Sequence, residues 1–378
     1  MRQNQEGCQK EAHSESPLFL SGRYGGGVAT MARSAVGEAA APGEHVRLGF
    51  DTYSIRGLQW KAPQVLNYAA GLKLDVLQIT HGDFESVEEP YLKKIKDQAD
   101  RLGIAIEPGF GCICPQSKGW NPKQGDPSEY LRRGILAAKT LGSRSFKVFM
   151  GNSADRAGWA PIPAMMEAAI KILKSVRSQA LDAGVMIAVE NHGDMQAREA
   201  KTLIEETGKD FVGICLDTGN PVMLMEDPLM TLEVLGPYVV TSHFRDAVVY
   251  ETPRGAAAQW VALGDGVIDF RRFVRRFAEL CPKVPFQLEI ITGSPPRELP
   301  YLETAFWKAF PNMPASDFAP FLALAKNGHP FMGSMLIAGA GKQPPEYQAA
   351  LIQQQRVDLE RSLDYAKNTL GVGVRWRA

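Results

Sequence analysis

Eight short apolar runs, separated by longer amphipathic segments, are the feature of this sequence that most constrains its fold. Each run has the length of a strand, and none alternates cleanly between apolar and polar residues. Such runs are typical of parallel strands buried on both faces, whose connections need about a dozen residues or more. The runs are residues 46–51, 74–80, 104–108, 144–150, 185–190, 212–217, 239–243 and 285–291.

The segments between the runs carry apolar residues at helical spacing, and Gly103, Gly142 and Gly184 stand where helix C-terminal caps belong. Strand and helix therefore alternate through eight units, which predicts an α/β fold of the (β/α)8 or TIM barrel type. An open doubly wound sheet is the alternative, but it usually has a Gly-rich phosphate turn after its first strand, and none follows Asp51. The predicted helices cover residues 87–102, 127–141, 162–183 and 268–280.

The two ends of the chain depart from this pattern. Residues 1–44 lack periodicity and are predicted to form a flexible tail, so that the barrel comprises residues 45–378. Residues 294–344 are rich in Pro, Gly, Phe and Met, and they precede an amphipathic segment, 346–370, that is expected to be the helix closing the barrel. Residues 294–344 are then an insertion in the last strand-to-helix loop, on the catalytic face of such barrels, where a lid or an oligomer contact is expected.

The composition of the chain limits which classes of partner it can bind and in which cellular compartment it is expected. The 42 basic residues balance 42 acidic ones, so no long-range field favours nucleic acid. Five scattered cysteines suit a reducing compartment, and no apolar stretch approaches the roughly 18 residues of a membrane helix. We therefore expect a cytoplasmic protein that binds neither nucleic acid nor membrane and that can assemble as a homo-oligomer. Export by a degenerate N-terminal signal is the alternative.

Acidic residues and one histidine stand at corresponding places in four successive runs. Glu190, Asp217 and His243 end the fifth, sixth and seventh runs, and Glu289 lies late in the eighth. Adjacent strands are about 4.8 Å apart, so side chains at the same end of the barrel can converge on one ion. Three carboxylates and an imidazole suit Mn²⁺ best, with Mg²⁺, Co²⁺, Fe²⁺ or Zn²⁺ as alternatives.

Each of these residues also has a purely structural interpretation. Asp217 precedes Thr218-Gly219-Asn220 and can cap the following helix, while a single histidine is more often a core residue than a ligand. Glu190 and Glu289 lie in apolar runs, where an unpaired charge costs several kcal/mol, so each needs a compensating cation or arginine. An arginine can take the place of the metal.

The segments AVENHGD, LDTGNP, SHFRD, LGDG and QLE together resemble the sugar phosphate isomerase/epimerase superfamily, also called the xylose isomerase-like barrels. This resemblance implies that Glu190, Asp217, His243 and Glu289 are metal ligands. It also implies that Glu190 and Glu289 exchange a proton with the carbon next to a substrate carbonyl. The substrate would be a ketose, a ketose phosphate or another keto-sugar. A metal suits this chemistry because it stabilises the negative charge of the developing enediolate, and two carboxylates can remove and return the proton.

Further polar residues are candidates for binding the substrate. Arg245 can hold a phosphate or carboxylate, or it can pair with Asp246. Asn220 stands where the family's epimerases often have a histidine that contacts the substrate, a departure that weighs against a ketohexose substrate. The remaining candidates lie at strand ends or just beyond them, apart from Lys147 inside the fourth run: His81, Glu107, Lys147 and His192.

Three other functions remain as alternatives. The first is a metal-dependent lyase that uses the same site. It would be a dehydratase or a deglycosidase, and its substrate would be a 3-keto-glycoside or an inosose. An apurinic endonuclease-like barrel would need additional histidines, and the chain has Asn220 and Val267 at those places. A non-catalytic sugar-binding barrel would not need four convergent ligands.

Overall fold

The computed structural model describes residues 43–158, 162–339 and 341–378, and all of them belong to one compact unit. The predicted tail, residues 1–44, lies almost wholly outside the described residues. Within the described ranges, no helix is both long and apolar enough to cross a membrane.

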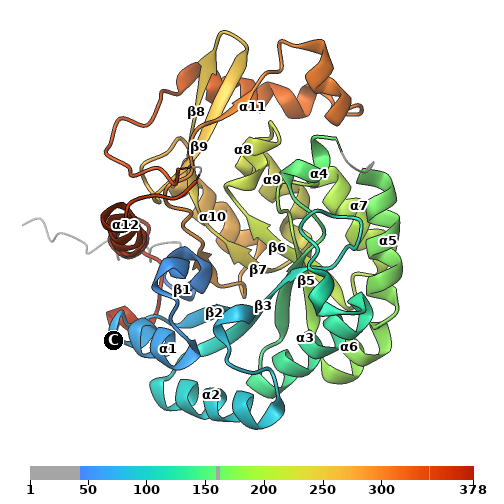
Figure 1. Ribbon diagram of the computed structural model, residues 1–378, viewed down its shortest axis with the longest axis vertical. Helices are drawn as coiled ribbons and strands as arrows, with labels where there is room; N and C mark the ends of the chain where they lie inside the picture. Colours follow the sequence, from blue (N-terminus) through green and yellow to red (C-terminus); the bar gives the residue numbers. More distant parts are fainter. Residues whose placement is uncertain (1–42, 159–161, 340) are drawn as a thin grey trace, which may run out of the picture. The chain divides into compact units, whose positions relative to one another are not determined.

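Eight parallel strands form the central sheet, in the order β10-β1-β2-β3-β4-β5-β6-β7. The edges meet where Phe244, just beyond β7, bridges to Leu288 of β10. The N–H of Phe244 donates to the carbonyl of Gln287 at 2.7 Å, and the N–H of Glu289 donates to the carbonyl of Phe244 at 3.0 Å. This confirms the predicted TIM barrel (Figure 1). The strands are β1 Leu48–Asp51, β2 Val76–Thr80, β3 Ala105–Cys112, β4 Ser145–Phe149, β5 Met186–Glu190, β6 Val212–Asp217, β7 Val239–His243 and β10 Phe286–Leu288.

Helices surround the strands, and the predicted caps are present. Gly103, Gly142 and Gly184 adopt φ values of 67°, 71° and 64°, a left-handed conformation that suits glycine. The helices around the barrel are α1 Ala62–Gly71, α2 Glu89–Leu102, α3 Pro127–Leu141, α4 Ser153–Arg156, α5 Ile162–Lys174, α6 Arg177–Ala183, α7 Ala197–Thr207, α8 Asn220–Met223, α9 Pro228–Leu235, α10 Phe270–Leu280 and α12 Pro345–Asp364.

Helix α10 illustrates why these segments are helical. Its sequence FRRFVRRFAEL places Phe270, Phe273 and Phe277 on one face and arginines on the other. The three rings surround Phe244, which stacks on Phe286 of β10 with ring centroids 3.6 Å apart. This aromatic cluster therefore packs α10 against the strands that close the barrel.

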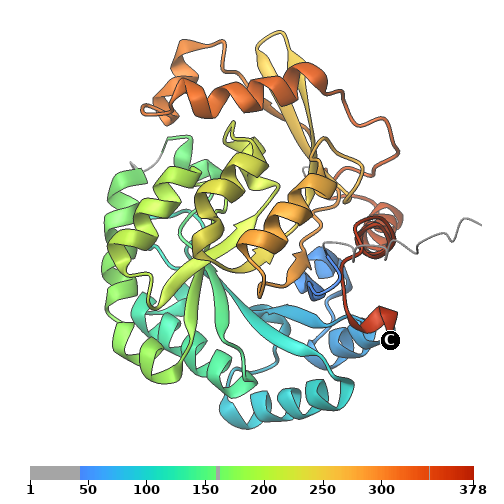
Figure 2. The same cartoon turned by 180° about the vertical axis from the view of Figure 1, so that it is seen from behind.

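A β-hairpin between β7 and α10 was not predicted from the sequence. Strands β8 Asp246–Thr252 and β9 Gly255–Val261 pair in antiparallel fashion, and β11 Arg297–Leu299 adds to β9. The predicted insertion supplies β11 and helix α11 Ala315–Asn327. In both views the hairpin and α11 lie together beside α8 and α4, above the loops that follow β6 and β4 (Figures 1 and 2).

This second layer has its own small apolar core. Met223 and Met225 from the segment after β6 pack with Leu299, Phe310 and Phe321 of the insertion. Apolar contacts of this kind fix the hairpin and the insertion over the strand ends. The closing helix α12 is anchored to the barrel by buried polar contacts, such as the Thr292 hydroxyl donating to Asp358 at 2.8 Å.

Candidate metal centre

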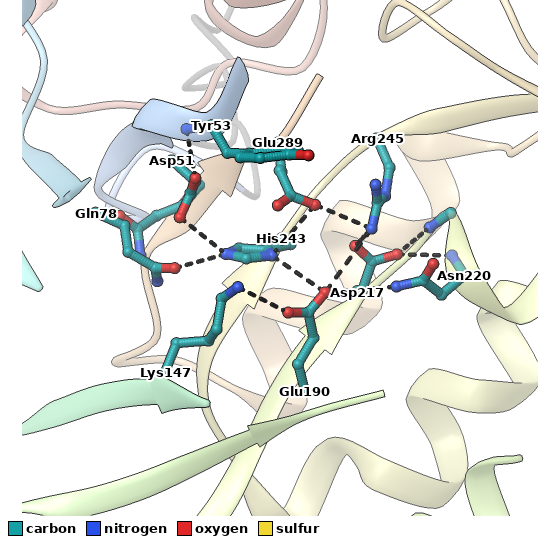
Figure 3. A network of polar contacts seen from close by, with 12 residues as sticks. Asp51, Tyr53, Gln78, Lys147, Glu190, Asp217, Asn220, His243, Arg245 and Glu289 are labelled. Atoms are coloured by element: carbon teal, nitrogen blue, oxygen red, sulfur yellow. Dashed lines mark hydrogen bonds and ion pairs between the residues drawn. The ribbon is translucent and has the colours of Figure 1, made fainter. Parts of the chain in front are cut away.

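Four ligand-type side chains converge at the carboxyl ends of neighbouring strands. One potential ligand atom from each of Glu190, Asp217, His243 and Glu289 lies within 4.8 Å of the corresponding atom of every other, and all four residues are buried. The strand register produces this cluster, because Asp217 is paired with His243 across β6 and β7, and the Glu289 backbone bonds to Phe244. The sequence placed these residues at equivalent strand ends, and the barrel brings them together (Figure 3).

The imidazole of His243 is oriented by Gln78 of β2. Its Nε2 lies 2.7 Å from the Gln78 Oε1, an acceptor, so the proton resides on Nε2. The other nitrogen, Nδ1, points toward Glu190 and Glu289, 3.5 Å from an oxygen of each. Burial lowers the pKa of His243, but Cys215 and these two carboxylates hold it well above its usual range, so a metal ion would have to displace the Nδ1 proton to use the lone pair. Nδ1 is buried and has no hydrogen-bond partner among the described residues. A lone pair held in this way is suited to ligate a metal.

Asp217 performs two structural tasks at once. Its Oδ1 accepts hydrogen bonds from the N–H groups of Gly219 at 2.8 Å and Asn220 at 2.6 Å, as expected of a capping residue. Its Oδ2 turns into the cluster and contacts the Arg245 guanidinium. The capping and site interpretations of Asp217 are therefore compatible, because each uses a different oxygen.

Arg245 is the cation nearest to the three carboxylates. Its Nη2 contacts Asp217 and lies 2.9 Å from Glu289 Oε2 and 3.8 Å from Glu190 Oε1. Its guanidinium also lies 4.5 Å from the ring centroid of Trp260. Asp246 is not its partner, because that carboxylate accepts backbone N–H groups of the loop after β9. Arg245 therefore compensates part of the negative charge of the cluster, as the arginine alternative predicted.

The charge of the cluster nevertheless fits a divalent cation in addition to Arg245. Four carboxylates meet there, because Asp51 Oδ2 lies 3.6 Å from His243 Nε2. Among the described residues, two cationic side chains form ion pairs with them: Arg245, and Lys147, whose Nζ is 3.1 Å from Glu190 Oε2. If a metal displaces the Nδ1 proton of His243, the imidazole is neutral and two negative charges remain, which is the charge that a divalent ion neutralises. Three oxygens and one nitrogen suit a hard or borderline ion.

The electrostatic environment gives the carboxylates of the site different pKa values. Burial raises the pKa of Glu190, but Lys147 and the nearby histidines hold it well below its usual range. Burial likewise raises the pKa of Glu289, and Arg245 holds that pKa below its usual range. By contrast, burial raises the pKa of Asp51 to about 6. Glu190 and Glu289 are therefore ionised at neutral pH and can coordinate a cation or accept a proton.

Three other predicted site residues lie beside this cluster. Lys147 pairs with Glu190, and the Asn220 amide donates to Glu190 Oε1 at 3.4 Å. His192 stacks on Phe149, with ring centroids 4.1 Å apart, and its Nδ1 lies 3.0 Å from the carbonyl of Gly151. Asn220 and His192 both line a cavity of about 210 Å³ that reaches Glu289.

Two predicted residues are not brought to the cluster. Glu107 lies inside the barrel, where its carboxylate accepts bonds from the Thr241 hydroxyl at 2.5 Å and the Gln287 amide at 2.8 Å. His81 packs against the ring of Phe110, with centroids 4.8 Å apart, and burial lowers its pKa. These contacts involve none of the four residues of the cluster.

Several residues of the site were missed by the sequence analysis. Asp51 ends β1 as Glu190 ends β5, and Gln78 interrupts the apolar run VLQIT, so each gave a detectable signal. Trp260 and Arg297 gave none, because they reach the cavity from the hairpin and from the insertion. Their positions depend on how these two segments fold back over the barrel.

Comparison with known proteins places these features in context. The sequence model of a family described as xylose isomerase-like TIM barrel matches residues 66–309. The Escherichia coli protein YihM, described as uncharacterized, is 21% identical over 207 residues, which are 54% of this chain and 57% of that protein. The chain thus spans little more than half the length of that relative. The 3-oxo-isoapionate decarboxylase of Pectobacterium atrosepticum is 24% identical over 236 residues, 59% of this chain and 78% of that protein.

Solved structures agree with the fold. A D-psicose 3-epimerase structure determined in the presence of D-fructose superposes with a TM-score of 0.56 at 14% identity, covering 86% of this chain and 99% of that chain. A xylose isomerase-like TIM barrel protein from Mycobacterium smegmatis in complex with magnesium gives a TM-score of 0.53 at 16% identity, covering 74% and 96%. At these identities the structural similarity shows the fold alone.

Proposed function

Because the chain belongs to the xylose isomerase-like TIM barrel family, we propose that it is a divalent-metal-dependent sugar isomerase or epimerase. It would remove a proton alpha to the carbonyl of a ketose, a ketose phosphate or another keto-sugar. The observation that carries the proposal is the convergence of four buried ligand atoms within 4.8 Å of one another, with the His243 Nδ1 unpartnered among the described residues.

Glu190, Asp217, His243 and Glu289 would hold the ion, with His243 coordinating through Nδ1. Mn²⁺ is the metal that we propose, and Mg²⁺, Co²⁺, Fe²⁺ and Zn²⁺ are alternatives. The chemistry that such an ion supplies when bound is stabilisation of negative charge on the substrate oxygens while the alpha proton leaves.

The chain itself supplies the proton-transfer groups. Glu289 lines the cavity and is kept ionised by Arg245, so its carboxylate is ready to accept a proton from a substrate bound there. Glu190 is fully buried, approaches the same His243 nitrogen as Glu289, and is kept ionised chiefly by Lys147. In our proposal, one of the two removes the alpha proton and the other returns it, which permits inversion of the carbon.

Metal analysis of purified variants tests the ligand assignment. Glu190→Gln, Asp217→Asn and His243→Ala should each bind less than the approximately one Mn²⁺ per chain expected of the unmodified protein. Glu107→Gln is the matched control, because it alters a buried carboxylate of the same barrel outside the cluster. Normal metal content in all three ligand variants would rule out this centre.

The reaction is tested by NMR in D₂O with the Mn²⁺-loaded chain and a panel of ketoses, ketose phosphates and 3-keto-glycosides. We expect deuterium to enter the alpha carbon of a substrate and an epimer or isomer to accumulate. Glu289→Gln should keep its fold and much of its metal affinity but lose about 10²- to 10⁴-fold in turnover. Turnover within a few-fold of the unmodified enzyme would exclude Glu289 as a proton-transfer group.

Lyase chemistry at the same site is the second candidate. The similarity to the 3-oxo-isoapionate decarboxylase supports it, because loss of carbon dioxide next to a carbonyl also generates an enolate. Elimination of water or an aglycone from an inosose or 3-keto-glycoside would begin with the same proton removal. The NMR experiment separates the reactions, since decarboxylation or elimination gives a product of different composition.

A further inference from the structure

Arg297 projects from the insertion into the space beside the metal centre. It is the first residue of β11, which pairs with β9 so that Arg297 lies opposite Ala258. Its side chain lines the same cavity of about 210 Å³ as Glu289 and Arg245, and also an adjoining cavity of about 320 Å³. Arg297 therefore stands at the junction of two spaces, one of which reaches the proposed proton-transfer group.

This arginine has no ionic or hydrogen-bonding partner among the described residues, although it is partly buried. The adjacent residue Glu298 does not pair with Arg297. It pairs with Arg254, and both side chains of that pair are exposed. Burial lowers the pKa of Arg297, and no carboxylate offsets that effect. A partly desolvated guanidinium without a partner is costly, and an anionic ligand would relieve the cost.

The remaining charges around the two cavities also favour an anion. Arg156 is already paired with Glu199, with a shortest distance of 2.8 Å, and Lys308 lies on the exposed rim. Glu289 is the single acidic residue in the lining of either cavity within the described ranges, and it shares Arg245 with Asp217. Once a divalent ion neutralises the cluster, Arg297 leaves this space with an excess of positive charge, which attracts anionic ligands.

We propose that Arg297 binds an anionic group of the substrate, a carboxylate or a phosphate, remote from the reacting carbonyl. The inference rests on the proposed function and narrows it from keto-sugars in general to acidic or phosphorylated keto-sugars. A guanidinium is suited to this task because its planar donors match either anion in a bidentate geometry. Arg245 cannot serve this end of the substrate while it is engaged by Asp217 and Glu289.

Calorimetric titration of the full Mn²⁺-loaded chain with a matched series tests this assignment. D-Fructose, D-fructose 6-phosphate and D-fructuronate share a ketose head and differ in the group at the far end, and D-ribulose is compared with its 5-phosphate. We expect at least one anionic member to bind about 10- to 100-fold more tightly than its neutral counterpart, the range for a charge-assisted bond. The compound that shows the larger gain in affinity, the carboxylate or the phosphate, identifies the anion that the site prefers.

The variants attribute the preference to one side chain. Arg297→Ala should abolish the preference without changing Mn²⁺ affinity, and Arg297→Lys should retain part of it. Arg275→Ala is the matched control, because it removes an exposed arginine of α10 away from both cavities, and it should retain the full preference.

Two results would overturn the inference: equal binding of neutral and anionic members by the unmodified chain, or an unchanged preference in Arg297→Ala. The titrations are repeated on metal-free protein, so that the anion preference is read independently of the metal. Failure of the unmodified chain to bind Mn²⁺ or any of the alternative ions would refute the proposed function, whereas normal metal binding without any anion preference would refute only the role of Arg297.

Discussion

Replacing Gln78 by leucine should weaken metal binding without touching a metal ligand. The Gln78 amide oxygen lies 2.7 Å from Nε2 of His243 and keeps the proton on that nitrogen, so that Nδ1 faces the carboxylates (Figure 3). Leucine has a similar size but cannot accept a hydrogen bond. The Asp51 carboxylate lies 3.6 Å from Nε2, which is too far for a good bond without movement of the ring.

The expected magnitude follows from this geometry. Loss of a partner that orients a metal-binding histidine typically reduces metal affinity about 10- to 100-fold. This corresponds to about 1.4 to 2.7 kcal/mol of binding free energy. Calorimetric titration of metal-free Gln78→Leu with Mn²⁺ measures the change directly, and circular dichroism verifies that the variant is folded.

Gln287→Leu is the matched control for this experiment. Gln287 is as buried as Gln78 and also belongs to a barrel strand, but its amide donates to Glu107 and Thr241 rather than to His243. Both variants should lower the melting temperature, and only Gln78→Leu should lower Mn²⁺ affinity. An affinity of Gln78→Leu within twofold of the unmodified protein would show that the Gln78 bond does not orient the imidazole.

Three further predictions concern stability. Gly134→Ala would place a methyl carbon 2.3 Å from the buried ring of Phe146, so chemical denaturation should show a loss of about 1 to 3 kcal/mol, and an unchanged midpoint would contradict this packing. Burial raises the pKa of Glu226 from 4.5 to about 8, so the free energy of unfolding should fall as the pH rises from 5 through 8. The melting temperature of Glu226→Gln should lack this fall. The same pH dependence in both proteins would refute the prediction. Arg245→Met leaves Asp217 and Glu289 without their cation and should cost about 3 to 5 kcal/mol in metal-free protein, with recovery in saturating Mn²⁺ as the distinguishing measurement.

The barrel could be predicted from the sequence because its determinants are local. A strand buried on both faces needs a continuous apolar run, and a surface helix needs an apolar stripe with a cap, and both patterns are complete within about 15 residues. The β8–β9 hairpin was missed because the contacts that stabilise it come from distant parts of the chain. Its strand AVVYET and the small-residue strand GAAAQW lie in one connection, and their apolar partners Met223 and Phe310 come from distant segments.

The candidate ligands were predictable for the same reason as the strands. A carboxylate at the end of a buried run is unusual in itself, and parallel strands of a barrel all end at one face, so Glu190, Asp217 and His243 had to lie near one another once the fold was known. The same reasoning placed Glu107 near the site, and it was wrong about its surroundings. Glu107 bonds to Thr241 and Gln287 inside the barrel, because β3 continues to Cys112 and Glu107 lies five residues before its end.

The sequence by itself therefore determined the eight units, their caps and the four side chains at the strand ends. Only the tertiary structure decided that Gln78 orients His243, that Arg245 pairs with Asp217 and Glu289 rather than with Asp246, and that Arg297 reaches the cavity. The physical reason is that periodicity and capping act between residues close in the chain, whereas hydrogen bonds and ion pairs depend on side-chain distances of a few ångströms between distant segments.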